Sequence, residues 1–172
     1  MTATVYPGRF TAHIESDFVV FLIGMRINKF FAFRKWLPVA RAMPRMIKTL
    51  YRHPEKGFLS AENFINGRTV LMVQYWRSFE DLERFARDPA DPHLEAWKQF
   101  HKAIGDDGSV GIWHETYVIR PGCHEAVYVN MPRFGLAQAS GHIPVSGTTQ
   151  TARQRISTAK HSPTRLSPLQ EA

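Results

Sequence analysis

Cysteine is almost absent from this chain of 172 residues, which restricts the kinds of site that the protein can contain. The single cysteine, Cys123, can form no intramolecular disulfide and can build no multi-cysteine zinc or iron–sulfur site. The chain also lacks the Pro-Cys-x-x-Cys element of zinc deaminases. We therefore predict no metal site, and we expect a cytoplasmic protein because nothing requires an oxidising compartment.

Long hydrophobic runs are also missing. The longest, residues 18–25, is only about half the length of roughly 20 residues that a membrane-spanning helix needs, and polar residues follow it directly. The amino terminus has no basic start, apolar run and small-residue cleavage site in succession. We expect neither secretion nor a membrane span.

Acidic residues are outnumbered, 15 against 22 Lys and Arg, which gives a formal net charge of +7. Such an excess raises the question of nucleic-acid binding. Residues 141–172 contain four Lys/Arg and one Glu, so they supply +3, and the remaining charge is spread thinly along the chain. We therefore expect a solvated basic surface without a basic stripe, and no nucleic-acid partner.

Known catalytic fingerprints are lacking too, since no glycine-rich phosphate loop, nucleophile elbow or flavin motif occurs. Hydrophobic residues, in contrast, make up 44% of the chain and include 12 Phe, 5 Tyr and 4 Trp. This supply is ample for the core of one domain.

Residues 70–117 contain three of the four Trp and form the most informative stretch. A strand over 69–76 leads to Ser78 and Asp81, an approximate capping box, so a short helix follows. Asp91 and Pro92 predict the start of a second helix, on which His93 and Trp97 are one turn apart. A strand over 110–120 completes the stretch.

The remaining elements follow from local patterns. Residues 17–26 predict a buried central strand, and 36–51 a helix with a kink or late start at Pro44. Asn66-Gly67 predicts a hairpin between strands 58–65 and 69–76, and 124–130 a last strand. Residues 1–16 are expected to be an arm, and the polar residues 138–172 a disordered tail.

This order of elements predicts a ferredoxin-like α+β domain over residues 17–137, with one antiparallel sheet and its helices on one face. The strands over 17–26 and 110–120 carry apolar residues on both faces. A partner should therefore cover the open face, most simply a second copy, and we predict a homodimer.

The motifs VQYWRSFEDLERFA and GIWHETY resemble the dimeric α/β-barrel superfamily of antibiotic-biosynthesis-monooxygenase-like proteins. They are closest to a monooxygenase-like branch found in bacterial and fungal natural-product settings. The resemblance covers residues 17–137. It implies a dimeric α/β barrel, a pocket between sheet and helices, and oxidation of hydrophobic, polycyclic or terpenoid-like molecules by cofactor-free or haem-assisted chemistry.

The haem-degrading branch of that superfamily uses an Asn after the first strand, a Trp on the helix that follows the third strand, and a His near the next helix. The resemblance places Asn28 and His93 at the first and third of these positions. The Trp position is Phe85 here, which argues against haem degradation.

The candidate catalytic residues are His93, His114, Glu115 and Asn28. His114 and Glu115 are neighbours on a strand, so they point to opposite faces and form no dyad. Each is either an acid/base in a pocket or a paired structural group. His93 lies in the first turn of its helix, where the neutral imidazole is favoured, as a general base or a haem ligand requires.

The candidate substrate-binding residues are aromatic, and they either stack on a flat substrate or fill the core. They are Tyr75, Trp76, Phe85, Trp97, Trp113 and Tyr117.

Three functions fit the residues to different degrees. The first is an oxygenase for a hydrophobic small molecule, in which a base and a dry pocket suffice if no cofactor is used. The second is a non-catalytic protein that binds a hydrophobic ligand or haem. The third is RNA binding, but residues 69–76 read TVLMVQYW and lack the basic-Gly-aromatic pattern of an RNA-recognition motif.

Overall fold

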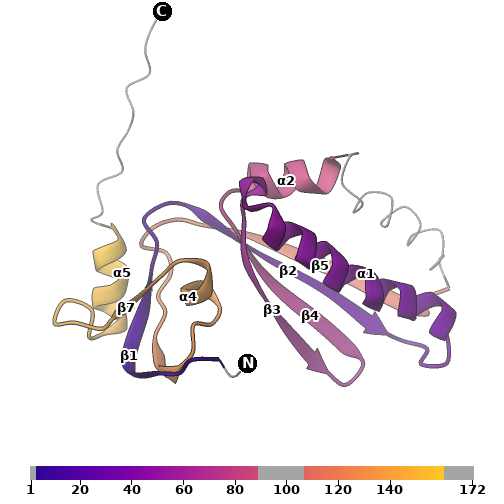
Figure 1. The fold of residues 1–172 in the computed structure, drawn as a ribbon, viewed down its shortest axis with the longest axis horizontal. Coiled ribbons are helices and arrows are strands. Elements are labelled where there is room, and N and C mark those ends of the chain that lie inside the picture. The colour runs from indigo at the N-terminus through magenta and orange to yellow at the C-terminus, as the bar shows by residue number, and fades with distance from the viewer. Residues whose placement is uncertain (1–2, 89–106, 161–172) are drawn as a thin grey trace, which may run out of the picture.

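The computed structural model describes residues 3–88 and 107–160, which form two antiparallel sheets with helices (Figure 1). The larger sheet has the strand order β3-β4-β2-β5. Its elements follow the chain in the order β2 (Phe18–Ile27), α1 (Phe33–Arg52), β3 (Phe58–Asn66), β4 (Thr69–Trp76), α2 (Phe79–Arg87) and β5 (Val110–Ile119). This is the βαββαβ order of a ferredoxin-like unit, so the predicted α+β fold is confirmed.

Strand β2 lies in the middle of the larger sheet and pairs with both β4 and β5. Its odd-numbered residues point toward the helices: Val19 is buried with Trp76 of β4 and Leu50 of α1 in one core cluster. We call this the helix-facing side and the other side the open side. The continuous apolar run of β2 is explained by this central position, which the sequence predicted.

Helix α1 covers the helix-facing side (Figure 1). It begins at Phe33, so of the two effects expected at Pro44, a kink or a late start, the late start is wrong. Both Pro38 and Pro44 lie inside it. An internal proline costs a helix about 3 kcal/mol or more. Burial of Leu50 and packing of Met46 and Ile47 against the sheet core offset that cost.

The predicted hairpin and helix cap are both present. Asn66 pairs with Thr69, so the two-residue turn is Gly67-Arg68 and lies one residue later than expected. Gly67 has φ +56°, which fits the first central position of a type II′ turn. At α2, the Ser78 hydroxyl accepts a hydrogen bond of 3.1 Å from the Asp81 amide, as the capping box predicted.

The smaller sheet has the order β6-β1-β7, with β1 (Tyr6–His13) in the middle between β6 (Tyr128–Met131) and β7 (Gly141–Pro144). Two short helices accompany it, α4 (Leu136–Ala139) and α5 (Ala152–Lys160). The expected arm therefore contains a central strand, and the last predicted strand joins this second sheet. Residues 138–172 were predicted to be disordered, and this prediction is wrong for residues 138–160, which contain β7 and α5.

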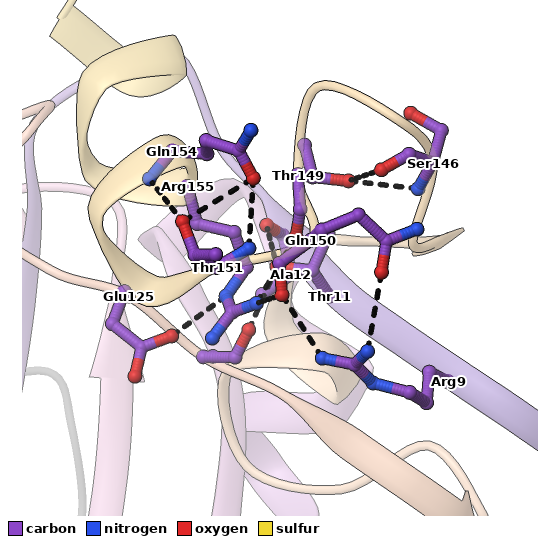
Figure 2. Close-up of polar contacts among 11 residues, drawn as sticks. Arg9, Thr11, Ala12, Glu125, Ser146, Thr149, Gln150, Thr151, Gln154 and Arg155 are labelled. Carbon is purple, nitrogen blue, oxygen red and sulfur yellow. Dashed lines mark hydrogen bonds and ion pairs between the residues drawn. The ribbon is translucent and has the colours of Figure 1, made fainter.

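Figure 2 shows why the polar segment after β7 is ordered. The buried guanidinium of Arg155 donates to the Glu125 carboxylate at 2.7 Å and to the carbonyl oxygens of Thr149 and Gln150. Arg9 of β1 donates to the Gln150 side chain and carbonyl. Charge-assisted hydrogen bonds thus replace the apolar burial that the composition lacks.

Candidate functional site

A cavity of about 450 Å³ lies between α1 and the larger sheet. Most of its lining is apolar, as in small-molecule sites generally. Its lining residues are Ala40, Met43, Pro44, Ile47, Lys48 and Tyr51 of α1, Asn63 of β3, and Val70 and Met72 of β4.

Three polar side chains border this cavity: Lys48, Tyr51 and Asn63. The Tyr51 hydroxyl accepts a hydrogen bond of 3.1 Å from the Ala61 amide, which fixes its position at the edge strand. Its own hydrogen can still be donated to a ligand oxygen. Hydroxyl and amide groups on an otherwise apolar wall can orient a molecule that has few oxygen atoms.

One row of paired residues crosses the sheet on this same side. Asn63 pairs with Met72, Met72 with Ile23, and Ile23 with His114. Neighbouring strands are about 4.8 Å apart, so Asn63 and His114 are separated by about 14 Å across the row. Two apolar residues thus lie between an amide at one edge strand and an imidazole at the other.

His114 lies exposed on the helix-facing side of β5. Its ring is 5.6 Å from the ring of Phe21, which packs against the core cluster. The sequence prediction that His114 and Glu115 point to opposite faces agrees with the register. The imidazole therefore shares a side of the sheet with the cavity, although it does not line the cavity itself.

Glu115 lies on the open side with Tyr117, whose hydroxyl donates a hydrogen bond to the carboxylate. This hydrogen bond to the Glu115 charge raises the pKa of Tyr117. The structure thus separates Glu115 from the cavity by the thickness of the sheet, and it brings Glu115 together with a phenol instead.

Asn28 lies just after β2, where its side-chain amide donates to the Gly108 carbonyl at 3.1 Å. Its backbone amide also donates to the Ser109 carbonyl. These bonds join the end of β2 to the turn that precedes β5. In this arrangement Asn28 is not brought close to the cavity lining.

The predicted aromatic residues divide into two groups. Trp76 and Phe85 are buried in the core, and the indole of Trp76 donates to Gln74 at 2.9 Å. Tyr75, Trp113 and Tyr117 belong to the open side. Burial raises the pKa of Tyr75. The residues His93 and Trp97 lie outside the described residues.

The cavity residues Tyr51 and Asn63 were not anticipated from the sequence. Tyr51 was recognisable only as the last aromatic residue of an amphipathic helix, and Asn63 only as a polar residue on the inward side of an edge strand. Both positions depend on the distance between helix and sheet, which a local pattern does not contain.

Haem and metals need specific ligands. The cavity lining contains no histidine or cysteine, and the haem ligand that the sequence suggests, His93, lies outside the described residues. Across residues 3–88 and 107–160, no group of three or more His, Cys, Asp and Glu could hold a metal ion.

None of the described helices is both long and apolar enough to cross a membrane.

The chain matches the family model described as monooxygenase af470-like over residues 18–136. Monooxygenase af470 of Aspergillus fumigatus is 29% identical over 148 residues, which are 74% of this chain and 52% of that protein. The chain thus spans about half the length of this curated relative.

Two solved structures are similar at low identity. SnoaB, a cofactor-independent oxygenase from Streptomyces nogalater, matches with a TM-score of 0.45 and 13% identity over 61% of this chain and 95% of that chain. A dimeric protein of ferredoxin-like fold from Bacteroides fragilis matches with a TM-score of 0.41 and 15% identity over 58% and 96%. At these scores the two matches carry no argument about function.

Proposed function

Since the chain belongs to the monooxygenase af470-like family, we propose that it is a monooxygenase-type oxidoreductase for a hydrophobic small molecule. The observation that carries this proposal is the apolar cavity of about 450 Å³ beneath α1, on the side of the sheet to which His114 also belongs. A flat, polycyclic or terpenoid-like substrate suits a space of this kind, because its surface is apolar and its few oxygen atoms need few polar partners.

In this proposal His114 is the general base. It takes a proton from a methylene carbon next to a carbonyl or an aromatic ring, and the carbanion then reacts with O₂. The methylene loses two hydrogens, one oxygen atom becomes the new carbonyl oxygen, and the other leaves as water. The methylene carbon is oxidised by four electrons and O₂ is reduced by the same four, so the reaction balances without a cofactor.

Tyr51 and Asn63 orient the substrate at the other end of the row. The free hydrogen of the Tyr51 hydroxyl and the Asn63 amide can donate to a substrate oxygen. Met72 and Ile23, which lie between them and His114, offer the substrate an apolar surface. We derive no step through haem; haem binding through His93 remains a prediction that titration with haemin tests.

The second candidate is a non-catalytic carrier of a hydrophobic ligand. It is favoured by one observation: the cavity lining contains no histidine or carboxylate, and His114 is exposed at the far edge strand. Under this alternative, the cavity binds its ligand and O₂ is not consumed.

Substitution of His114 by Gln separates the two functions. With a tricyclic ketone that has an acidic methylene group as probe, oxygen uptake should fall about 10²–10⁴-fold, while binding of the probe changes little. Because the side chain is exposed, the unfolding free energy should change by less than about 0.5 kcal/mol. Glu115→Gln, the neighbour on the other side of the sheet, is the matched control and should retain full uptake.

If the wild-type protein binds the probe without consuming O₂, the protein is a non-catalytic carrier. If His114→Gln consumes O₂ within tenfold of the wild type, His114 is not the base.

We also propose that the protein acts as a homodimer through the open side. The centre of this side is apolar, with Leu22 paired to Val73, and Glu62 and Glu115 stand at the two edge strands of the same row. Trp113 lies against Gly24 in the next row. The segment before α4 covers the β3 edge of this side, because the Gly135 amide donates to the Glu62 carboxylate at 3.0 Å. A partner usually covers the apolar remainder of such a face.

A further inference from the structure

The outer side of α1 carries a stripe of positive charge. Five exposed cations follow one another at spacings of 7, 4, 3 and 4 residues: Arg34, Arg41, Arg45, Lys48 and Arg52. At 3.6 residues per turn they lie within an arc of about 60° and extend over about 27 Å. The four arginines lie opposite the side that packs on the sheet, and Lys48 lies at the margin of the arc, where it also borders the cavity. The expectation of evenly spread charge without a basic stripe is therefore wrong.

Within residues 3–88 and 107–160, no acidic side chain pairs with this stripe. Helix α1 contains no acidic residue, and none of the five cations forms an ion pair with a residue in the described part of the chain. Like charges three or four residues apart destabilise a helix, and Arg34 stands at its positive end. The arrangement does not serve the stability of α1, which points to an external anionic partner.

An exposed aromatic cluster lies at the amino-terminal end of the same helix. Phe30, Phe31 and Phe33 are 49%, 86% and 44% exposed. Their ring centroids are 5.6–6.2 Å apart with interplanar angles of 74–83°, and Phe33 also packs against Trp36. Exposure of three phenylalanines side by side is unfavourable in water unless a partner covers them.

The aromatic cluster is held in place by the turn before β5. The Lys29 amide and ammonium donate to the carbonyls of Ser109 and Asp107, and Lys35 pairs with the Asp107 carboxylate at 2.8 Å. The indole of Trp36 donates to the Phe30 carbonyl at 2.9 Å. The rings are therefore presented on a fixed support, with little ordering required when they bind.

We propose that α1 and the aromatic cluster form a membrane-binding surface for anionic lipids. The cations bind phosphate and carboxylate headgroups, and the phenylalanines enter the acyl boundary, which is the combination typical of interfacial helices. A nucleic acid fits less well, because base stacking requires open ring faces. Phe30, Phe31 and Phe33 are instead nearly perpendicular to one another, so they form no row of parallel rings on which successive bases could stack.

The test uses flotation of the full chain with phosphatidylcholine vesicles, with and without phosphatidylserine. We expect binding only when phosphatidylserine is present, and weaker binding as the salt concentration rises. The variant Arg34→Gln/Arg41→Gln/Arg45→Gln should lose about fivefold in affinity per cation, or about a hundredfold in total. Phe31→Ala keeps every charge and should lose about tenfold.

The matched control removes the same charge from other elements. Arg87→Gln/Arg120→Gln/Arg153→Gln changes three exposed cations outside α1 and should bind as the wild type does. Far-ultraviolet circular dichroism of each variant confirms that it is folded. The proposal is overturned if the wild type ignores phosphatidylserine, if the two triple variants weaken equally, or if RNA or DNA is bound through these residues while vesicles are not.

Discussion

Replacing Gly57 by alanine tests how α2 is anchored to the larger sheet. Gly57 has φ +82° and lies directly under the first turn of α2. A Cβ atom there would stand 2.2 Å from an oxygen of the Asp81 carboxylate and 2.5 Å from its Cγ. That carboxylate accepts hydrogen bonds from Arg77 at 2.8 Å and Arg84 at 2.9 Å, so alanine must displace the centre of an ion-pair network.

Two costs contribute to the expected fall in the free energy of unfolding. The left-handed backbone conformation costs an alanine about 1–2 kcal/mol. Displacement of Asp81 loses charge-assisted hydrogen bonds, and because the side chains of Arg77 and Arg84 are 54% and 68% exposed, we count only about 1 kcal/mol for these bonds. The sum of about 2–3 kcal/mol corresponds to a fall in Tm of about 4–12 °C for a chain of this size.

Urea unfolding followed by circular dichroism measures this loss, and Gly67→Ala is its control. Gly67 also has positive φ, but an added Cβ there meets nothing within 4 Å, so only the backbone cost remains. In an Asp81→Gly background, which removes the Cβ of residue 81 (2.6 Å from the added atom) together with the carboxylate, Gly57→Ala should likewise cost only about 1–2 kcal/mol. Equal losses for the two glycine variants, or strict additivity with Asp81→Gly, would refute the reasoning.

Three further predictions concern acid stability, the cavity and the open side. Burial raises the pKa of Asp81, but the hydrogen bond and charge of Arg77, helped by Arg84, outweigh it and hold the pKa below its ordinary value. The ionised Asp81 therefore stabilises the fold at any pH above its pKa in the unfolded chain, and this stabilisation is lost as the pH falls below about 4. In an acid titration, the free energy of unfolding of Asp81→Asn should fall less steeply than that of the wild type. Tyr51→Phe should weaken a ketone ligand about tenfold in a titration and leave a pure hydrocarbon ligand unaffected. Light scattering should show that the wild type is the proposed homodimer and that Val73→Arg is a folded monomer; a monomeric wild type would contradict the proposal.

The larger sheet was predictable because each of its signals is local. A continuous apolar run identified β2, a Gly-containing dipeptide identified the hairpin, and Ser78 with Asp81 identified the start of α2. Each of these features needs only a few neighbouring residues. Two details of this part were wrong. Helix α1 begins at Phe33 because tertiary packing overrode the local effect of Pro44, and the hairpin turn lies one residue later than Asn66-Gly67.

The smaller sheet and the cavity were not predictable in the same way. Strand β1 pairs with β7 at a separation of more than a hundred residues, for example Thr11 with Ile143, and such pairing leaves no local signal. The segment after β7 is ordered by the single buried cation of Arg155, whose partner Glu125 is 30 residues away. His114 was identified from its residue type, whereas Tyr51 and Asn63 required the register of the sheet.

The central position of β1 also has a consequence for protein synthesis. It is synthesised before the strands of the larger sheet, yet both of its neighbours, β6 and β7, follow those strands in the sequence. The βαββαβ unit can therefore assemble while β1 still has two unpaired edges, and unpaired edges are sites of aggregation. An affinity tag joined directly to Tyr6 would stand beside those unpaired edges during synthesis and should hinder their pairing.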